Sequence, residues 1–132
     1  MSRFVLDASA VVEYLLRTPT GDRVEAKVRA EGADLHTPAL CDVEVAAALR
    51  RGLLAGRLGP QRVAEAVEDY FDLPLTRHGH RRFIERVLEL RNNFSAYDAT
   101  YTALAEQLGA ALITADERLA TATRTHLAVE VT

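Results

Sequence analysis

Two short phrases each place a carboxylate and a hydroxyl two residues apart at the end of an apolar run. Near the N-terminus the chain reads R-F-V-L-D-A-S, where the run ends in Asp7 and Ser9 follows. Near the C-terminus it reads A-A-L-I-T-A-D, where the run ends in Thr114 and Asp116 follows. Because Asp, Ser and Thr cap helices, local structure is one explanation. Carboxylate oxygens also bind hard divalent cations, so metal chemistry is the other.

The sequence neighbours of two further acids, Asp98 and Glu44, indicate what each acid does. Asp98 follows Ser95 by three residues, as in a capping box, where a first-turn acid also favours the helix dipole. Glu44 lies in V-E-V-A-A-A-L, which is apolar on almost every side. A helix that is apolar all round is usually buried, and a buried carboxylate needs a partner or a metal. A position at an exposed edge is the alternative for Glu44.

The elements that would position these acids follow from periodicity and from turn residues. We expect strands at 3–7, 34–37, 110–114 and 127–131, a short strand at 73–75, and helices at 9–16, 21–31, 38–51, 60–71, 79–91, 95–108 and 116–121. Ser9 and Gly109 are the predicted N-cap of the first helix and C′ residue of the helix at 95–108. In that helix a stripe is predicted to face the core: Tyr97, Tyr101, Leu104 and Leu108.

Strands that alternate with helices predict parallel pairing and an α/β fold. The predicted architecture is a three-layer α/β/α sandwich with a central, mostly parallel sheet. In such folds ligands bind at the carboxyl ends of the strands. Asp7 and Asp116 should lie at that edge, and the helix that starts near Asp98 runs antiparallel to the strands and starts there. Glu44 follows the second strand and could point back towards the same edge.

Four acids that converge in this way would repel one another unless a cation compensates their charge. Hard oxygen ligands suit Mg²⁺ or Mn²⁺, so the candidate catalytic and metal-binding residues are Asp7, Glu44, Asp98 and Asp116. Ser9 and Thr114 would then orient carboxylates or contact metal-bound water. This arrangement would explain why each apolar run ends in a carboxylate and a hydroxyl.

Composition limits the class of protein. The chain has 132 residues, 48% of them apolar, which suits a single folded domain over 1–132. A single cysteine, Cys41, excludes an internal disulfide, and no apolar run approaches the roughly 20 residues of a membrane span. With no signal peptide visible either, we expect a cytoplasmic protein without membrane association. The net charge of −3 argues against a simple nucleic-acid binder.

These motifs, in this order, resemble the PIN domain, and specifically the VapC-type toxins of type II bacterial toxin–antitoxin pairs. V-L-D-A-S-A-V-V-E-Y-L-L is similar to the opening of that family, and P-A-L-C-D-V-E-V-A-A-A-L-R-R is similar to its glutamate helix. F-S-A-Y-D-A-T-Y-T-A-L-A-E-Q-L-G-A-A-L-I-T-A-D-E-R-L-A is similar to its C-terminal half. The resemblance covers nearly the whole chain, although residues 53–90 are generic.

The resemblance implies a PIN-like fold and a metal-dependent endoribonuclease that inhibits translation and growth when free of its antitoxin. Asp7, Glu44, Asp98 and Asp116 match the four acidic positions of the family, and Thr114 matches its usual hydroxyl. Such toxins typically form homodimers and are held inactive by a VapB-type antitoxin whose C-terminal tail lies over the active site. The expected substrate is RNA, with tRNA or rRNA as the target.

Arginines around the rim of such a site would follow the RNA backbone. The candidates are Arg50, Arg51, Arg81, Arg82 and Arg91, and ordinary surface arginines are the alternative for each. His78-Gly79-His80 is interpreted as a loop and Cys41 as a small packed residue, because neither has a matching partner in the sequence.

Two other classes of function remain open at this point. The first is Mg²⁺-dependent phosphoryl transfer on another α/β fold. A phosphatase would need D-x-D where this chain has D-A-S, and a receiver domain would need a late lysine, whereas Lys27 is the only lysine. The second is a non-enzymatic interaction module that binds a helical partner through V-A-A-A-L and L-A-E-Q-L.

Overall fold

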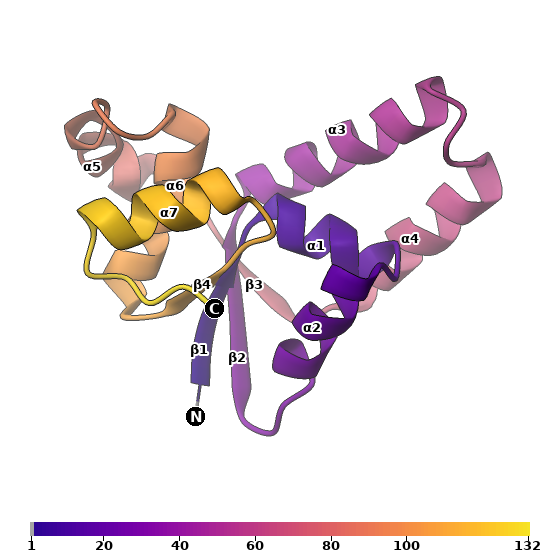
Figure 1. The fold of residues 1–132 in the computed structure, drawn as a ribbon, viewed down its shortest axis with the longest axis horizontal. Helices are drawn as coiled ribbons and strands as arrows, with labels where there is room; N and C mark the ends of the chain where they lie inside the picture. The colour runs from indigo at the N-terminus through magenta and orange to yellow at the C-terminus, as the bar shows by residue number, and fades with distance from the viewer. Residues whose placement is uncertain (1) are drawn as a thin grey trace.

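A computed structural model describes residues 2–132, in which a parallel sheet of four strands forms the centre (Figure 1). The strands are β1 (Ser2–Leu6), β2 (Ala33–Pro38), β3 (Leu75–His78) and β4 (Ala111–Ile113). Their order across the sheet is β3-β2-β1-β4, and every neighbouring pair is parallel. The predicted α/β class with a central parallel sheet is confirmed.

Helices cover the sheet on both sides. They are α1 (Ala8–Leu15), α2 (Pro19–Val28), α3 (Leu40–Leu54), α4 (Pro60–Asp72), α5 (Ile84–Glu89), α6 (Ala96–Leu108) and α7 (Glu117–His126), with a 3₁₀ turn at Arg81–Phe83. In Figure 1 the sheet separates α1–α4 on the right from α5–α7 on the left. This division follows from right-handed crossovers, because the chain steps one way across the sheet from β1 to β3 and then back to β4.

The central strands are buried because they are apolar along their length. Val5 and Leu6 of β1 and Leu112 of β4 have no exposed surface, and Ile113 has 1%. From the side of the sheet that α5–α7 cover, α6 contributes Leu104, which is also fully buried. Leu104 belongs to a continuous buried run from 99 to 105. A parallel sheet with helices on both sides needs strands of this kind. The core therefore fixes β1 and β4 side by side, with their carboxyl ends at one edge.

The start of the first helix differs from the prediction. Asp7, and not Ser9, is the N-cap of α1, because its side chain accepts a hydrogen bond from the Ala10 backbone N–H at 3.0 Å. The two ends of α6 are as predicted: the Ser95 side chain accepts from the Asp98 N–H, and Gly109 ends the helix in the left-handed conformation with φ 61°. Asp7 thus combines a structural role with its place at the strand end.

Several predicted details are wrong. Tyr97 is 62% exposed and does not join the core stripe, because the first turn of α6 lies at the edge of the sheet. The predicted strand at 127–131 is only a single bridge between Leu112 and Val131. The predicted helix at 79–91 is a 3₁₀ turn followed by the short α5, and the strand predicted at 73–75 lies at Leu75–His78.

The glutamate helix α3 is also less buried than its composition suggested. Val43 is 68% exposed and Leu54 is 71% exposed, so one apolar face of α3 points away from the core. In Figure 1, α3 and α4 extend together beyond the sheet. Within residues 2–132, no helix is both long enough and apolar enough to span a bilayer.

Candidate active site

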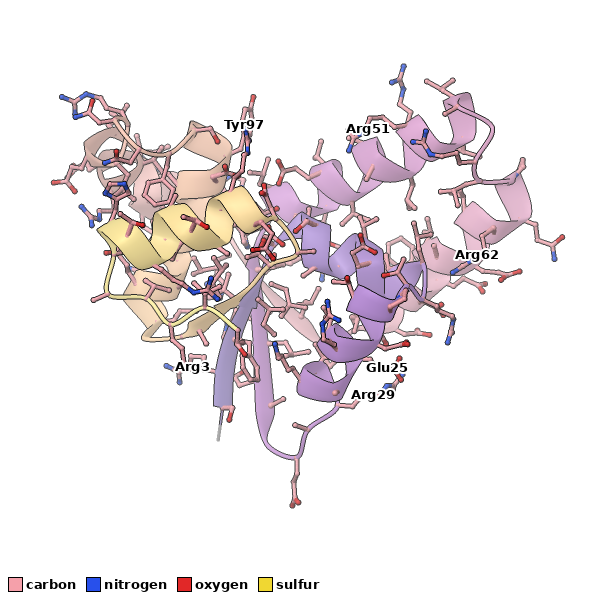
Figure 2. All side chains as sticks on the ribbon, in the orientation of Figure 1. Arg3, Glu25, Arg29, Arg51, Arg62 and Tyr97 are labelled. Carbon is pink, nitrogen blue, oxygen red and sulfur yellow. The ribbon has the colours of Figure 1, made fainter. Side chains whose placement is uncertain are left out.

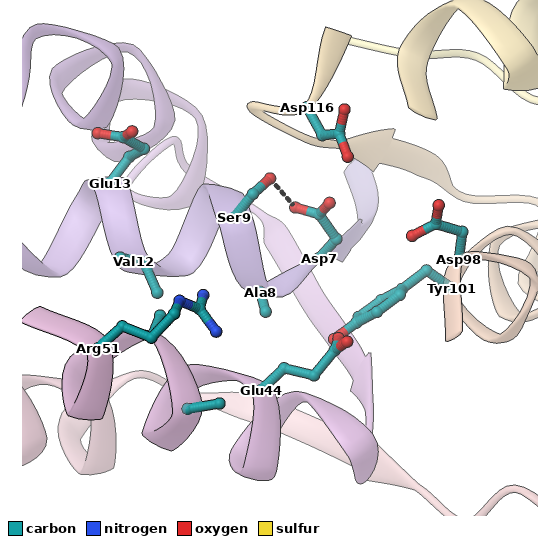
Figure 3. A pocket seen from close by; sticks show the side chains of 12 residues that line it. Asp7, Ala8, Ser9, Val12, Glu13, Glu44, Arg51, Asp98, Tyr101 and Asp116 are labelled. Atoms are coloured by element: carbon teal, nitrogen blue, oxygen red, sulfur yellow. Dashed lines mark hydrogen bonds between the residues drawn. The ribbon is translucent and has the colours of Figure 1, made fainter. Parts of the chain in front are cut away.

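A cavity of about 450 Å³ opens at the carboxyl edge of the sheet, between the N-terminal ends of α1, α6 and α7 and the side of α3 (Figure 3). All four acids singled out by the sequence line it. The lining residues are Asp7, Ala8, Ser9, Val12, Glu13, Glu44, Ala47, Ala48, Arg51, Asp98, Tyr101 and Asp116. Four segments that are far apart in the chain therefore contribute carboxylates to one cavity.

Asp7 is the most buried of these acids, with 5% of its surface exposed. Its Oδ1 atom accepts from the Ser9 hydroxyl at 2.7 Å and from the Ala10 N–H, and its Oδ2 atom accepts from the Thr114 hydroxyl at 2.6 Å. Burial nevertheless dominates and raises the pKa of Asp7 to about 6, although these three hydrogen bonds lower it. A buried carboxylate whose ionised form is destabilised in this way is one that a nearby cation would stabilise.

The two hydroxyls join the ends of β1 and β4. The Thr114 hydroxyl donates to Asp7 and accepts from the Asp116 N–H at 3.0 Å. The Ser9 hydroxyl accepts from the Ala115 N–H at 3.0 Å and lies 3.3 Å from the Thr114 hydroxyl. The repeated spacing in the sequence thus has a structural reason: both hydroxyls donate to the Asp7 carboxylate, and each accepts from a backbone N–H of the segment that follows β4.

Asp116 and Asp98 enter the cavity from two helix starts. Asp116 is the N-cap of α7 and accepts from the Arg118 and Leu119 N–H groups. Asp98 lies in the first turn of α6 and is half-buried. Its pKa is raised, first by burial and then by the negative charges of Asp116 and Glu44. These carboxylates therefore interact electrostatically across the cavity.

Glu44 reaches the cavity from the opposite wall, in the second turn of α3 (Figure 3). Its Oε1 atom accepts a hydrogen bond from the Tyr101 hydroxyl at 2.5 Å. Tyr101 is only 2% exposed, so its ring is fixed in the core while its hydroxyl meets the cavity. The sequence placed Tyr101 in the core stripe but missed this contact; the apolar surroundings of Glu44 were the available signal that it needs a partner.

The donor set fits a hard divalent cation. All four acids offer oxygen, and the raised pKa values of Asp7 and Asp98 express burial and repulsion that a cation would relieve. Within residues 2–132, no three His, Cys, Asp or Glu side chains are already close enough to hold one ion together. The carboxylates instead surround an open cavity.

The five predicted RNA-binding arginines are dispersed. Only Arg51 lines the cavity, from α3 on the side away from Asp98 (Figure 3). Arg50 is exposed on α3 and does not line it. Arg81 and Arg82 lie in the 3₁₀ turn after β3, and Arg91 donates to the Leu88 carbonyl.

His78 and His80 each contact a polar atom of another segment, and Cys41 lies in the core. His78 ends β3, so its interpretation as a loop residue is wrong, and its Nε2 atom lies 2.8 Å from His36 Nδ1. His80 accepts from the Leu40 N–H at the start of α3. Cys41 is fully buried, as predicted.

Comparisons with known proteins agree with this geometry. The family model described as PIN domain matches residues 4–124. The chain belongs to the PIN domain family. It is similar to three proteins of Mycobacterium tuberculosis: Ribonuclease VapC12 (40% identity, 88% of each chain), Ribonuclease VapC9 (43%, 87% of each) and Ribonuclease VapC3 (41%, 89% of this chain and 85% of the relative). The resemblance seen in the sequence is therefore confirmed.

A solved structure supports the fold. The crystal structure of PAE2754 from Pyrobaculum aerophilum superposes with a TM-score of 0.73 over 98% of this chain and 83% of that one. At 19% sequence identity, this likeness concerns the arrangement of the elements only.

Proposed function

We propose that this protein is a metal-dependent endoribonuclease that acts as the toxin of a toxin–antitoxin pair. The observation that carries the proposal is the convergence of Asp7, Glu44, Asp98 and Asp116 on one cavity at the carboxyl edge of a PIN domain sheet. The similarity over most of the chain to proteins named VapC ribonucleases supports the same reaction. Hydrolysis of an RNA phosphodiester is the activity that this oxygen-rich site serves best.

The cofactor is Mg²⁺ or Mn²⁺, because carboxylate and water oxygens are the ligands that both ions prefer. Asp7, Asp98 and Asp116 would hold the cation directly, and Glu44 would hold it directly or through water. When bound, the cation supplies a Lewis acid that polarises the phosphodiester, makes a nearby water more acidic and stabilises the charge of the leaving 3′ oxygen. Hydrolysis of this kind leaves a 5′-phosphate and a 3′-hydroxyl.

The chain itself holds the carboxylates in place. Ser9 and Thr114 fix both oxygens of Asp7, and the backbone N–H groups of α7 fix Asp116. The cation also reverses the local electrostatics, so that an acidic cavity can accept a polyanion. Arg51, which lines the same cavity, is placed to contact an RNA phosphate.

A VapB-type antitoxin would keep the enzyme inactive, and the surface between α3 and α4 offers a place for it. A mainly apolar cavity of about 460 Å³ there includes Phe71, which is 74% exposed. Exposed apolar surface of this kind marks a site of protein interaction. A homodimer, a cytoplasmic location and a tRNA or rRNA target complete the proposal.

The test is cleavage of total cellular RNA by the purified, antitoxin-free protein with Mg²⁺ or Mn²⁺. We expect discrete fragments with 5′-phosphate ends that disappear when EDTA removes the metal. Mapping the fragment ends identifies the target. If a broad RNA pool, including intact tRNA and rRNA, stays uncut at micromolar protein with either metal, the nuclease proposal is wrong and a non-enzymatic interaction module replaces it.

Tyr101→Phe should lower kcat roughly 10-fold, in the range measured when groups that support metal ligands are removed. The substitution deletes the hydroxyl that holds Glu44 Oε1 and leaves the buried ring in place. The apparent affinity for Mn²⁺, followed by the metal-induced shift of Tm, should weaken as well, while KM for RNA stays within about twofold.

Tyr70→Phe is the matched control. Tyr70 also donates to an acid on α3, Asp42, but it lines the apolar α3–α4 cavity and not the acidic one. A loss of stability without a change in kcat or in Mn²⁺ affinity is expected for Tyr70→Phe. If the two variants lose kcat equally, Tyr101 acts only through the packing of α3, and its role at Glu44 must be abandoned.

A further inference from the structure

A second polar cavity, the α2–α7 cavity, lies beside the acidic site and has a volume of about 220 Å³. It is bounded by one side of α2, the end of β4, one side of α7 and the C-terminal residues. Figure 1 shows this C-terminal segment between α7 and α2. The lining residues are Thr20, Arg23, Val24, Lys27, Ile113, Thr114, Ala115, Glu117, Ala120, Arg124, Val131 and Thr132.

Three cationic side chains meet in this cavity, Arg23 and Lys27 from α2 and Arg124 from α7. Among residues 2–132, none of the three forms an ion pair, although Glu117 also belongs to the lining. Five of the fifteen arginines in the sequence do have carboxylate partners: Arg3, Arg17, Arg29, Arg77 and Arg86. The α2–α7 cavity thus collects positive charge that the fold does not neutralise by an ion pair.

The local electrostatics are consistent with this excess. The pKa of Lys27 is lowered, first by burial and then by the positive charge of Arg23. A lysine in such a position favours an anion, because the anion restores the interactions that burial and a like charge remove. Arginine adds planar N–H donors that match phosphate oxygens.

The position of the cavity relates it to the acidic site. Thr114 and Ala115 line the α2–α7 cavity, and the next residue, Asp116, lines the acidic cavity. The short segment between β4 and α7 therefore forms a wall of both. A polyanion that passes over this segment would place one charged group at the carboxylates and a neighbouring one among the cations.

We propose that the α2–α7 cavity binds a backbone phosphate of the RNA strand, next to the phosphate that is cleaved. This inference rests on the proposed ribonuclease function and adds to it a subsite that none of the arginines predicted from the sequence occupies. Because the contact is to a phosphate, it contributes affinity and register but carries no base specificity.

Binding of a fluorescent single-stranded RNA in EDTA, measured over a range of salt concentrations, tests the subsite without cleavage. The variant is Arg23→Ala/Lys27→Ala. The control is Arg29→Ala/Arg57→Ala, which removes the same charge from the exposed C-cap of α2 (Arg29 in Figure 2) and from an exposed bend, both outside the cavity. We expect at least ~10-fold weaker binding for the cavity variant than for the control. Its slope of log K against log salt should also be shallower by about 0.7, the contribution of one single-strand phosphate contact.

Cleavage then separates the subsite from the function. In Mg²⁺ or Mn²⁺ the cavity variant should raise KM for RNA by about the factor lost in binding, with kcat within about twofold of the wild type. Equal RNA affinity and equal salt slopes in the two double variants would overturn the subsite. A wild-type protein that binds RNA through this cavity but cuts none would contradict the ribonuclease proposal and leave the subsite standing.

Discussion

Asp98→Asn should lower metal-dependent RNA cleavage by at least ~100-fold, because even groups that only support metal ligands cost 10–100-fold when they are removed. The same change should raise the Tm of the metal-free protein. The pKa of Asp98 is raised by burial and by the charges of Asp116 and Glu44, so its ionised form is unfavourable in the folded state at neutral pH. Asparagine has nearly the same shape and removes that charge, and the Ser95 cap persists because it binds the backbone N–H of residue 98.

A cleavage rate that falls while the Tm of the metal-free protein rises is the result expected when an acid is removed from a cluster that binds a cation. Asp22→Asn is the matched control, since Asp22 is an exposed acid in the first turn of α2 and away from the cavity. There the charge favours the helix dipole, so its loss should leave the Tm unchanged or slightly lower and the cleavage rate unaffected. Thermal melting in EDTA and initial cleavage rates in Mn²⁺ measure both quantities. Cleavage by Asp98→Asn at the wild-type rate would remove Asp98 from the site.

The part of the site that sequence reasoning located is the part dictated by topology. Parallel strands bring their carboxyl ends to one edge, so residues placed at strand ends and at the starts of returning helices had to meet. Asp7, Asp98 and Asp116 satisfied that rule, and the structure places them around one cavity. Glu44 was placed by a different argument, because a carboxylate among apolar neighbours needs a partner. The candidate site could be predicted because the place of each acid within its own strand or helix follows from the sequence, and a parallel sheet brings those places to one edge.

The features that the sequence did not predict depend on contacts between elements, and no single segment of the chain encodes such contacts. Tyr101 has the spacing of a core residue, and its hydroxyl reaches Glu44 only because α6 and α3, from opposite sides of the sheet, both border the cavity at the carboxyl edge. Tyr97 has the same spacing but lies at the exposed start of the helix, where no strand remains to cover it. The cations of the α2–α7 cavity come from helices nearly a hundred residues apart, so their convergence left no pattern in the sequence.

Proton competition at Asp7 should make the affinity for Mn²⁺ depend on pH near neutrality. The pKa of Asp7 is about 6 in the metal-free fold, so below pH 6 the carboxyl group is mainly neutral and a cation must displace a proton to bind. One competing proton with this pKa weakens the apparent affinity about 10-fold between pH 7 and pH 5. With the ordinary value of 3.8, the affinity would be nearly flat over the same range. Calorimetric titration with Mn²⁺ at several pH values measures the difference.

A pair of substitutions at Thr114 assigns this pH dependence to Asp7. The Thr114 hydroxyl donates to Asp7 Oδ2, and that hydrogen bond lowers the pKa of the carboxyl group. Thr114→Val removes the donor, so the loss of Mn²⁺ affinity should begin at a higher pH than in the wild type, whereas Thr114→Ser keeps the hydroxyl and should behave like the wild type. The sign follows from linkage: a group that holds its proton more tightly yields it to a cation only at higher pH. Identical pH profiles for the valine and serine variants would show that the titrating group is not Asp7, and the role of the strand-end hydroxyl would then be limited to joining β1 to β4.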